Sequence, residues 1–109
     1  HADVCVHTTL EESFCMVILE AMAQGVPCVG GKESGGVPWL LDDGNAGLVV
    51  DVRVPTEVAE AMLRLAREPE TYQRVAAQGL ARVKELFTLE AVAKQYITVY
   101  RKILAAAKP

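Results

Sequence analysis

Residues 8–24 read TTLEESFCMVILEAMAQ, and this stretch decides the predicted fold because its character changes partway along. Residues 8–13 are mostly polar, which is typical of a loop. From Phe14 onward the sequence is almost continuously apolar, which indicates a buried helix. Gly25 and Pro27 follow, and they predict the end of that helix, since glycine favours the C-terminal cap and proline cannot continue a helix.

Short β-branched segments on both sides of this loop and helix predict strands. Residues 3–7 precede the loop, residues 27–30 follow the helix, and residues 46–50 form a third segment. Residues 37–42 predict a short helix between the second and third strands. Right-handed crossovers would join the three strands into one parallel sheet. We therefore predict an α/β fold of three parallel strands with flanking helices.

The second half of the chain is predicted to be helical. Pro55 and Pro69 stand at the first positions of two helices, and Thr88 is the expected N-cap of a third. Tyr96 and Tyr100 of that last helix, together with Trp39, are expected to be packing residues rather than platforms for a sugar.

A parallel sheet normally has both faces and both edges covered. We therefore expect these strands to be the second half of a doubly wound domain whose first half lies upstream of His1. The strand at residues 3–7 would then have an open edge in this chain, which favours self-association.

Composition narrows the class of protein. The chain has 109 residues, of which 51% are hydrophobic and 23% charged, as in one globular domain. The net charge is −3 and basic residues are scattered along the helices, which argues against a nucleic-acid partner. No apolar run approaches the roughly 20 residues that cross a bilayer. The three cysteines lack C-x-x-C spacing and a nearby histidine pair, so we expect no metal site, no disulfide and a reducing cytoplasmic setting.

Two acids frame the predicted helix start. Glu12 lies in the loop, and Glu20 lies eight residues later, about 10 Å along the helix at about 1.5 Å per residue. This separation exceeds the roughly 5 Å of a retaining glycosidase pair but suits two groups that bind opposite ends of an extended ligand. The free amides around residues 14–17 would attract a phosphate group.

Taken alone, two glutamates eight residues apart are typical of solvated surface acids. Because Glu20 interrupts an apolar stretch, however, we expect it to be partly buried and hydrogen-bonded. His7, at the end of the first strand, is expected to be a partly buried structural residue.

The motifs follow one another in a recognisable order. Residues 2–4 read ADV, residues 12–29 read ESFCMVILEAMAQGVPCV, residues 34–38 read SGGVP, and residues 43–50 read DGNAGLVV. This order resembles the C-terminal, donor-binding domain of the retaining GT-B glycosyltransferases of family 4, whose motif is E-G-F-G-x-x-x-x-E-A-M-A-x-G-x-P-V-V. Both glutamates are in register, and the resemblance covers essentially the whole chain.

The resemblance implies site residues. Glu20 matches the acid that holds the ribose hydroxyls of a nucleotide-sugar, and Glu12 matches the catalytic-site acid near the donor sugar. The backbone amides around Cys15, Met16 and Val17 match those that meet the sugar hydroxyls and the diphosphate. The other residues implied to line the cleft are Ser13, Phe14, Gly35 and Gly36.

The implied reaction transfers a hexose, with retention, from a nucleotide-diphosphate sugar to a hydroxyl of a glycan or small acceptor. It needs no cofactor and no tightly bound metal. Residues 1–109 would form part of the donor-binding domain, with its upstream half and the acceptor domain absent, so the chain alone is expected to be inactive. The whole protein is expected to be cytoplasmic or peripheral at a membrane.

Two competing interpretations remain. In the first, the chain is a non-catalytic scaffold or assembly domain with a vestigial nucleotide-sugar site, because Ser13 and Cys15 replace glycines of the family and Trp39 replaces a glutamate. The second is a nicotinamide oxidoreductase domain. It is disfavoured because no G-x-G-x-x-G follows any predicted strand.

Overall fold

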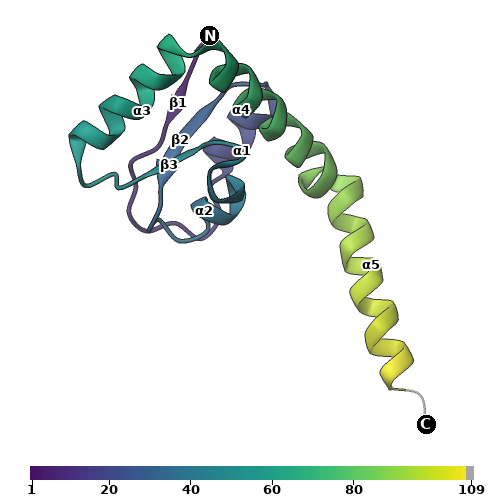
Figure 1. Ribbon diagram of the computed structural model, residues 1–109. Helices are drawn as coiled ribbons and strands as arrows, with labels where there is room; N and C mark the ends of the chain where they lie inside the picture. The colour runs from purple at the N-terminus through teal and green to yellow at the C-terminus, as the bar shows by residue number, and fades with distance from the viewer. Residues whose placement is uncertain (108–109) are drawn as a thin grey trace.

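The computed structural model describes residues 1–107 and confirms a parallel sheet with helices on both faces (Figure 1). The sheet has the order β1–β2–β3, with β1 at Cys5–Val6, β2 at Cys28–Gly31 and β3 at Leu48–Val50. Both strand pairs are parallel, as the crossovers predict. The observed strands are shorter than the predicted ones but fall within or beside them.

Helices account for most of the remaining chain described by the structure. They are α1 (Met16–Ala23), α2 (Val37–Leu40), α3 (Pro55–Arg67), α4 (Pro69–Arg82) and α5 (Leu89–Ala106). A 3₁₀ turn at Asp42–Gly44 follows α2, and a π-helical turn at Val83–Phe87 joins α4 to α5. Helix α1 begins two residues later than the apolar pattern predicts, because Cys15 is the N-cap and keeps an extended backbone.

The sheet separates two apolar cores. One lies between the sheet and helices α1 and α2, and its fully buried side chains include Ile18, Met22, Leu40 and Leu41. The other lies beneath α3 and contains Val29, Leu48, Ala61, Leu65 and Val75. Helix α4 contacts both α1 and α3 and so closes one side of the body. This two-sided covering is the expected arrangement for parallel strands.

Local backbone chemistry sets the ends of two helices as predicted. Gly25 has φ +72°, and its amide donates to the Met22 carbonyl at 3.0 Å while the Val26 amide donates to the Ala21 carbonyl at 3.0 Å. This is the Schellman motif that glycine favours. At the start of α5, the Thr88 hydroxyl accepts from the amide of Ala91 at 3.1 Å.

A glycine turn after β2 fixes the loop after β1. The Gly36 amide donates to the Glu12 carbonyl at 3.0 Å. Gly35 has φ +60°, and a Cβ atom there would overlap the Glu12 carbonyl, whereas a Cβ atom on Gly36 would overlap the Ser13 carbonyl. The turn therefore lies directly against the backbone that carries Glu12.

An aromatic cluster joins α2 to the end of α4. The Trp39 ring is 57% exposed and lies edge-on to Phe87 at 5.3 Å, while Phe14 contacts the same Phe87 ring at 5.7 Å. The Arg82 guanidinium lies 5.5 Å from the Trp39 ring centroid. It also donates to the carbonyls of Trp39 at 2.7 Å and Leu40 at 3.1 Å.

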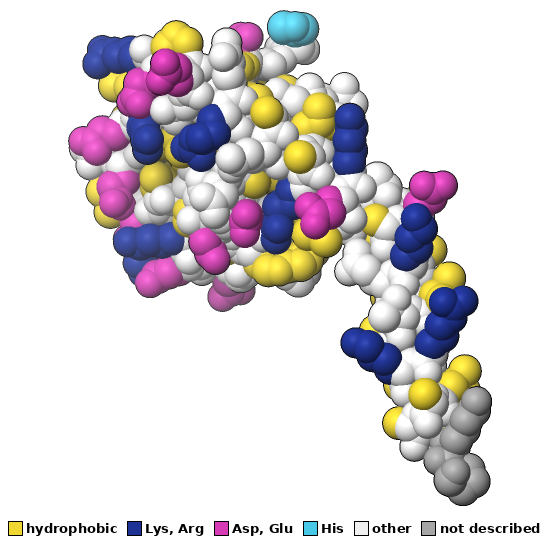
Figure 2. All heavy atoms as spheres, turned by 45° about the vertical axis from the view of Figure 1, so that its right-hand side comes forward, with side chains coloured by type: hydrophobic (Ala, Val, Ile, Leu, Met, Phe, Trp, Pro, Cys, Tyr) yellow, Lys and Arg dark blue, Asp and Glu magenta, His cyan; other side chains and the backbone are white. Residues whose placement is uncertain are grey.

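Helix α5 projects away from the body, which gives the molecule dimensions of 59 × 25 × 21 Å (Figure 1). Tyr96 and Tyr100 are 59% and 58% exposed, so the expectation that they are packing residues is wrong for the chain described here. In Figure 2, hydrophobic and basic side chains lie side by side along this helix. No helix within residues 1–107 combines the length and the hydropathy that a membrane crossing requires.

The turn between β3 and α3 is held by one carboxylate. Asp51 accepts hydrogen bonds from the Arg53 backbone amide at 3.0 Å, from its Nε at 2.9 Å and from its Nη2 at 3.1 Å. Arg53 also pairs with Glu33 at 2.7 Å. The bonds from Arg53 lower the pKa of Asp51 to about 2.

We predict that Gly35→Ala destabilises the fold more than Gly25→Ala. Both glycines have a positive φ, which costs an alanine about 1–2 kcal/mol. Only at Gly35 would the new Cβ meet backbone, since no atom of residues 1–107 lies within 4 Å of that position at Gly25. Urea unfolding should therefore give Gly35→Ala the lower midpoint, and equal midpoints would contradict the close approach described here.

We also predict a pH dependence of stability that Asp51→Asn removes. The folded pKa of about 2 lies below the ordinary value of 3.8, so between these pH values the unfolded chain binds more protons. The stabilisation is therefore present above about pH 4 and is lost as the pH falls toward 2. Thermal unfolding at pH 6, 4, 3 and 2 should show a steeper acid loss for the unchanged chain than for Asp51→Asn.

Candidate functional site

The predicted site lies at the carboxyl ends of β1 and β2. The loop that follows β1 runs from His7 to Cys15, and the turn that follows β2 carries Gly35 and Gly36. Open α/β sheets bind ligands at this end of their strands. The structure thus brings the loop and the glycine turn together where the resemblance expects a cleft.

The N-terminus of α1 is uncapped. Cys15 makes no side-chain cap, the first turn has no acidic residue, and the first amide bonded within the helix is that of Leu19, which donates to the Cys15 carbonyl at 3.1 Å. Within residues 1–107, the amides of Met16 and Val17 therefore have no hydrogen-bond partner. Both residues are more than half exposed, so the helix start lies at the surface, and free amides at a helix start attract anions.

Glu12 sits beside this helix start. Its side chain is 28% exposed, and its Oε2 atom lies 3.8 Å from Nε2 of His7. The hydrogen bond from Gly36 fixes its carbonyl. Ser13, the next residue, is exposed, whereas Phe14 turns inward against Phe87. Ser13 is thus exposed and Glu12 partly exposed on the side of the loop next to the helix start.

Glu20 is exposed, so the expectation that it is partly buried is wrong. It shares a face of α1 with Met16 and Val17, while Ile18 and Met22 on the opposite face fill the core. The apolar sequence around Glu20 suggested burial on every side, but the sheet covers only one face of the helix. The Glu20 carboxylate therefore remains hydrated and free to meet a ligand.

Two of the three departures from the family motif leave this region open, and the third, Ser13, is an exposed side chain at its border. The Cys15 side chain is 2% exposed and belongs to the core beneath α1. The Trp39 ring lies against Phe87 and Arg82. Neither side chain therefore fills the surface between the loop and the first turn of α1.

One group of side chains was missed by the sequence interpretation. A ring nitrogen of His7, a carboxylate oxygen of Glu12 and Sγ of Cys15 all lie within 4.8 Å of one another. Paired cysteines or paired histidines are the usual sequence signal of a zinc site, and this group has only one of each. The signal that could have found it is the spacing H-x4-E-x2-C across a loop that follows a strand.

The other two cysteines belong to the core. Cys5 and Cys28 are partners in the β1–β2 ladder, and Cys28 is fully buried. Burial raises the pKa of both thiols, that of Cys28 strongly. The thiol is then protonated at neutral pH and behaves as a small apolar group.

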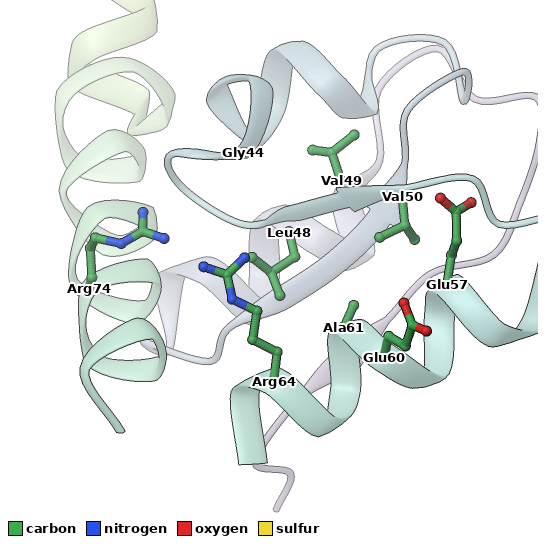
Figure 3. A pocket seen from close by; sticks show the side chains of 9 residues that line it. All are labelled: Gly44, Leu48, Val49, Val50, Glu57, Glu60, Ala61, Arg64 and Arg74. Atoms are coloured by element: carbon green, nitrogen blue, oxygen red, sulfur yellow. The ribbon is translucent and has the colours of Figure 1, made fainter. Parts of the chain in front are cut away.

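A separate hollow of about 330 Å³ lies against β3, the edge strand on the far side from β1. Figure 3 shows Leu48 and Val50 at its floor, with the side chains of Arg64 and Arg74 pointing toward each other across it. Arg74 donates to the Asn45 carbonyl at 3.4 Å. None of the predicted site residues lines this hollow, so it is distinct from the site at the strand ends.

Comparison with known proteins gives consistent matches. The family model described as glycosyl transferases group 1 matches residues 1–82. N-acetyl-alpha-D-glucosaminyl L-malate synthase of Bacillus anthracis is 34% identical over 103 residues, which cover 94% of this chain and 27% of that protein. Among solved structures, sucrose-phosphate synthase of Thermosynechococcus elongatus has a TM-score of 0.80 at 33% identity, covering 97% of this chain and 26% of its own.

A further solved structure is HepE of Anabaena in complex with UDP-glucose. It has a TM-score of 0.80 at 25% identity and covers 92% of this chain and 28% of its own. The chain therefore spans about a quarter of the length of these proteins. The family match, the parallel sheet and these superpositions together show that the chain belongs to the group 1 glycosyl transferases and has the fold of the C-terminal part of a GT-B Rossmann-like domain.

Proposed function

We propose that this chain forms part of the donor site of an enzyme that transfers a hexose, with retention, from a nucleotide-diphosphate sugar to a hydroxyl acceptor. One observation carries the proposal: the uncapped, exposed start of α1 lies beside Glu12 at the carboxyl end of the sheet. This arrangement offers hydrogen-bond donors and an acid in one place. Residues 1–109 then act as part of the donor-binding domain of the whole protein.

The helix start would serve the leaving group. As the bond to the sugar breaks, negative charge develops on the diphosphate, and the amides of Met16 and Val17 together with the helix dipole can stabilise it. Each well-aimed donor of this kind contributes a few kcal/mol to such a step. HepE was solved with UDP-glucose bound, and its likeness to this chain supports a nucleotide-sugar as the ligand.

The two glutamates would bind different parts of the nucleotide-sugar donor. Glu20 accepts hydrogen bonds from the ribose diol, and its exposure keeps the carboxylate accessible for this role. Glu12 lies near the donor sugar, on a loop whose position is set by Gly35 and Gly36. Ser13 is exposed beside Glu12 and would border the sugar pocket.

We further propose that the transfer needs no tightly bound metal, because the helix start can supply the positive potential that a cation otherwise provides. The segments that select the base and the acceptor, and the acceptor domain itself, are proposed to lie outside residues 1–109. The whole protein is proposed to act in the cytoplasm or at the membrane periphery on a glycan or a small hydroxyl compound.

The competing proposal is a scaffold with a vestigial site. The burial of Cys15 argues against it, because this substituted side chain leaves the helix start open. Nucleotide-sugar binding by the whole protein separates the two. A scaffold with a vestigial site would bind none of UDP-glucose, GDP-mannose and ADP-glucose.

We predict that Glu20→Ala in the whole protein weakens donor binding by roughly 1.5–3 kcal/mol, the range for hydrogen bonds to a charged group. Calorimetry should use whichever of those three sugars the unchanged protein binds. The matched control is Glu60→Ala, which removes an exposed carboxylate from α3 on the other face of the sheet. An affinity that Glu20→Ala leaves unchanged would remove Glu20 from the site.

We predict that the 109-residue chain self-associates through β1. The β1 amides that face β2 are those of Cys5, which donates to Pro27, and His7, which donates to Val29. Alternation along the strand then directs the Val6 amide to the open edge. Sedimentation should show dimers or larger species that decrease in Val6→Pro, which removes that amide, and Val6→Ala is the matched control for the loss of the side chain that packs against the core beneath α3. A monomer at all concentrations would contradict pairing through this edge.

A further inference from the structure

His7, Glu12 and Cys15 form a compact group of metal ligands at the carboxyl end of β1. Their ligand atoms all lie within 4.8 Å of one another. His7 comes from the end of the strand, Glu12 from the loop and Cys15 from the N-cap of α1. We propose that these three side chains bind one zinc ion.

Ordinary contacts leave the polar atoms of this group unsatisfied. The His7 Nε2 and Glu12 Oε2 atoms are 3.8 Å apart, which is too long for a hydrogen bond. Within residues 1–107, the buried Nδ1 atom of His7 has no hydrogen-bond partner, and the Cys15 thiol is 2% exposed. Buried polar atoms are nearly always paired, so the unpaired Nδ1 atom shows that the His7 imidazole lacks a partner that a ligand could supply.

The spacing suits a tetrahedral ion. Zn–N and Zn–O distances of about 2.0–2.2 Å and a Zn–S distance of about 2.3 Å place two ligands of one zinc ion about 3.4–3.6 Å apart. The His7–Glu12 separation of 3.8 Å is already close to this value. Small rotations of the three side chains would bring their ligand atoms to the separation that zinc requires. The hydrogen bond from Gly36 keeps the Glu12 backbone in place.

The donor set and its charge select zinc. A thiolate and an imidazole favour zinc over magnesium or calcium, which prefer oxygen ligands. When the Zn–S bond forms, the Cys15 thiol releases its proton to solvent. The thiolate and the Glu12 carboxylate then balance the two positive charges of zinc, and His7 stays neutral. A centre without net charge suits side chains that are 2–28% exposed.

Three protein ligands leave the fourth position of the ion to water. With zinc bound, the Glu12 carboxylate is no longer available to a sugar. Zinc therefore competes with the donor, and this consequence, unlike the binding itself, rests on the proposed function. The ion acts here as an inhibitor of a transfer that does not need it.

Cobalt titration of the 109-residue chain tests the binding, because Co²⁺ replaces zinc and gives an absorption band when a thiolate coordinates it. The unchanged chain should show the full band at one equivalent of Co²⁺, and added Zn²⁺ should displace the cobalt and remove the band. Cys15→Ser should abolish the band, whereas His7→Ala and Glu12→Gln should weaken the affinity at least about tenfold. The matched control is Cys5→Ser, which changes a thiol outside the group and should keep the band.

Absence of the band in the unchanged chain, or its persistence in Cys15→Ser, would overturn the proposal. Circular dichroism checks that each variant is folded, and Cys15→Ala replaces Cys15→Ser if the serine is not tolerated. A loss of the band in Cys5→Ser would also contradict the assignment. Because the readout is spectroscopic, its outcome does not depend on whether the whole protein binds a nucleotide-sugar.

Discussion

The hydrogen bond from the Gly36 amide to the Glu12 carbonyl, 3.0 Å long, is the contact on which the site depends. It joins the connection after β2 to the connection after β1, and these are the two segments that meet at the carboxyl end of the sheet. Only residues without a Cβ atom allow this approach, because the Glu12 and Ser13 carbonyls occupy that space. The glycines therefore act on the site by fixing the position of the Glu12 backbone.

Much of the fold could be predicted because its signals are local. Gly25, Thr88 and the prolines at positions 55 and 69 mark helix ends through backbone chemistry that involves only neighbouring residues. The three strands follow from short β-branched segments, and their parallel order follows from crossover handedness. In these places local preference and tertiary structure agree, which is typical of natural sequences.

The candidate site was harder to predict because its properties depend on which surfaces are covered. The apolar sequence on both sides of Glu20 gives no sign that one helix face stays open, and Tyr96 and Tyr100 likewise depend on contacts beyond their own helix. The approach of His7, Glu12 and Cys15 arises from the path of the loop, which residue spacing alone does not define. The one acid of this group thus has two proposed ligands, a sugar and a metal ion, that cannot be bound together.

The packing of Trp39 has a practical consequence for the study of this chain. It is the only tryptophan, and its indole ring rests against Phe87 and the Arg82 guanidinium where the π-helical turn meets the body. Its fluorescence emission therefore arises from one defined junction. Because the residue is 57% exposed, a loosening of that junction would alter the intensity and wavelength of its emission. The fluorescence of Trp39 therefore reports on the packing at the junction through which α5 is joined to the body.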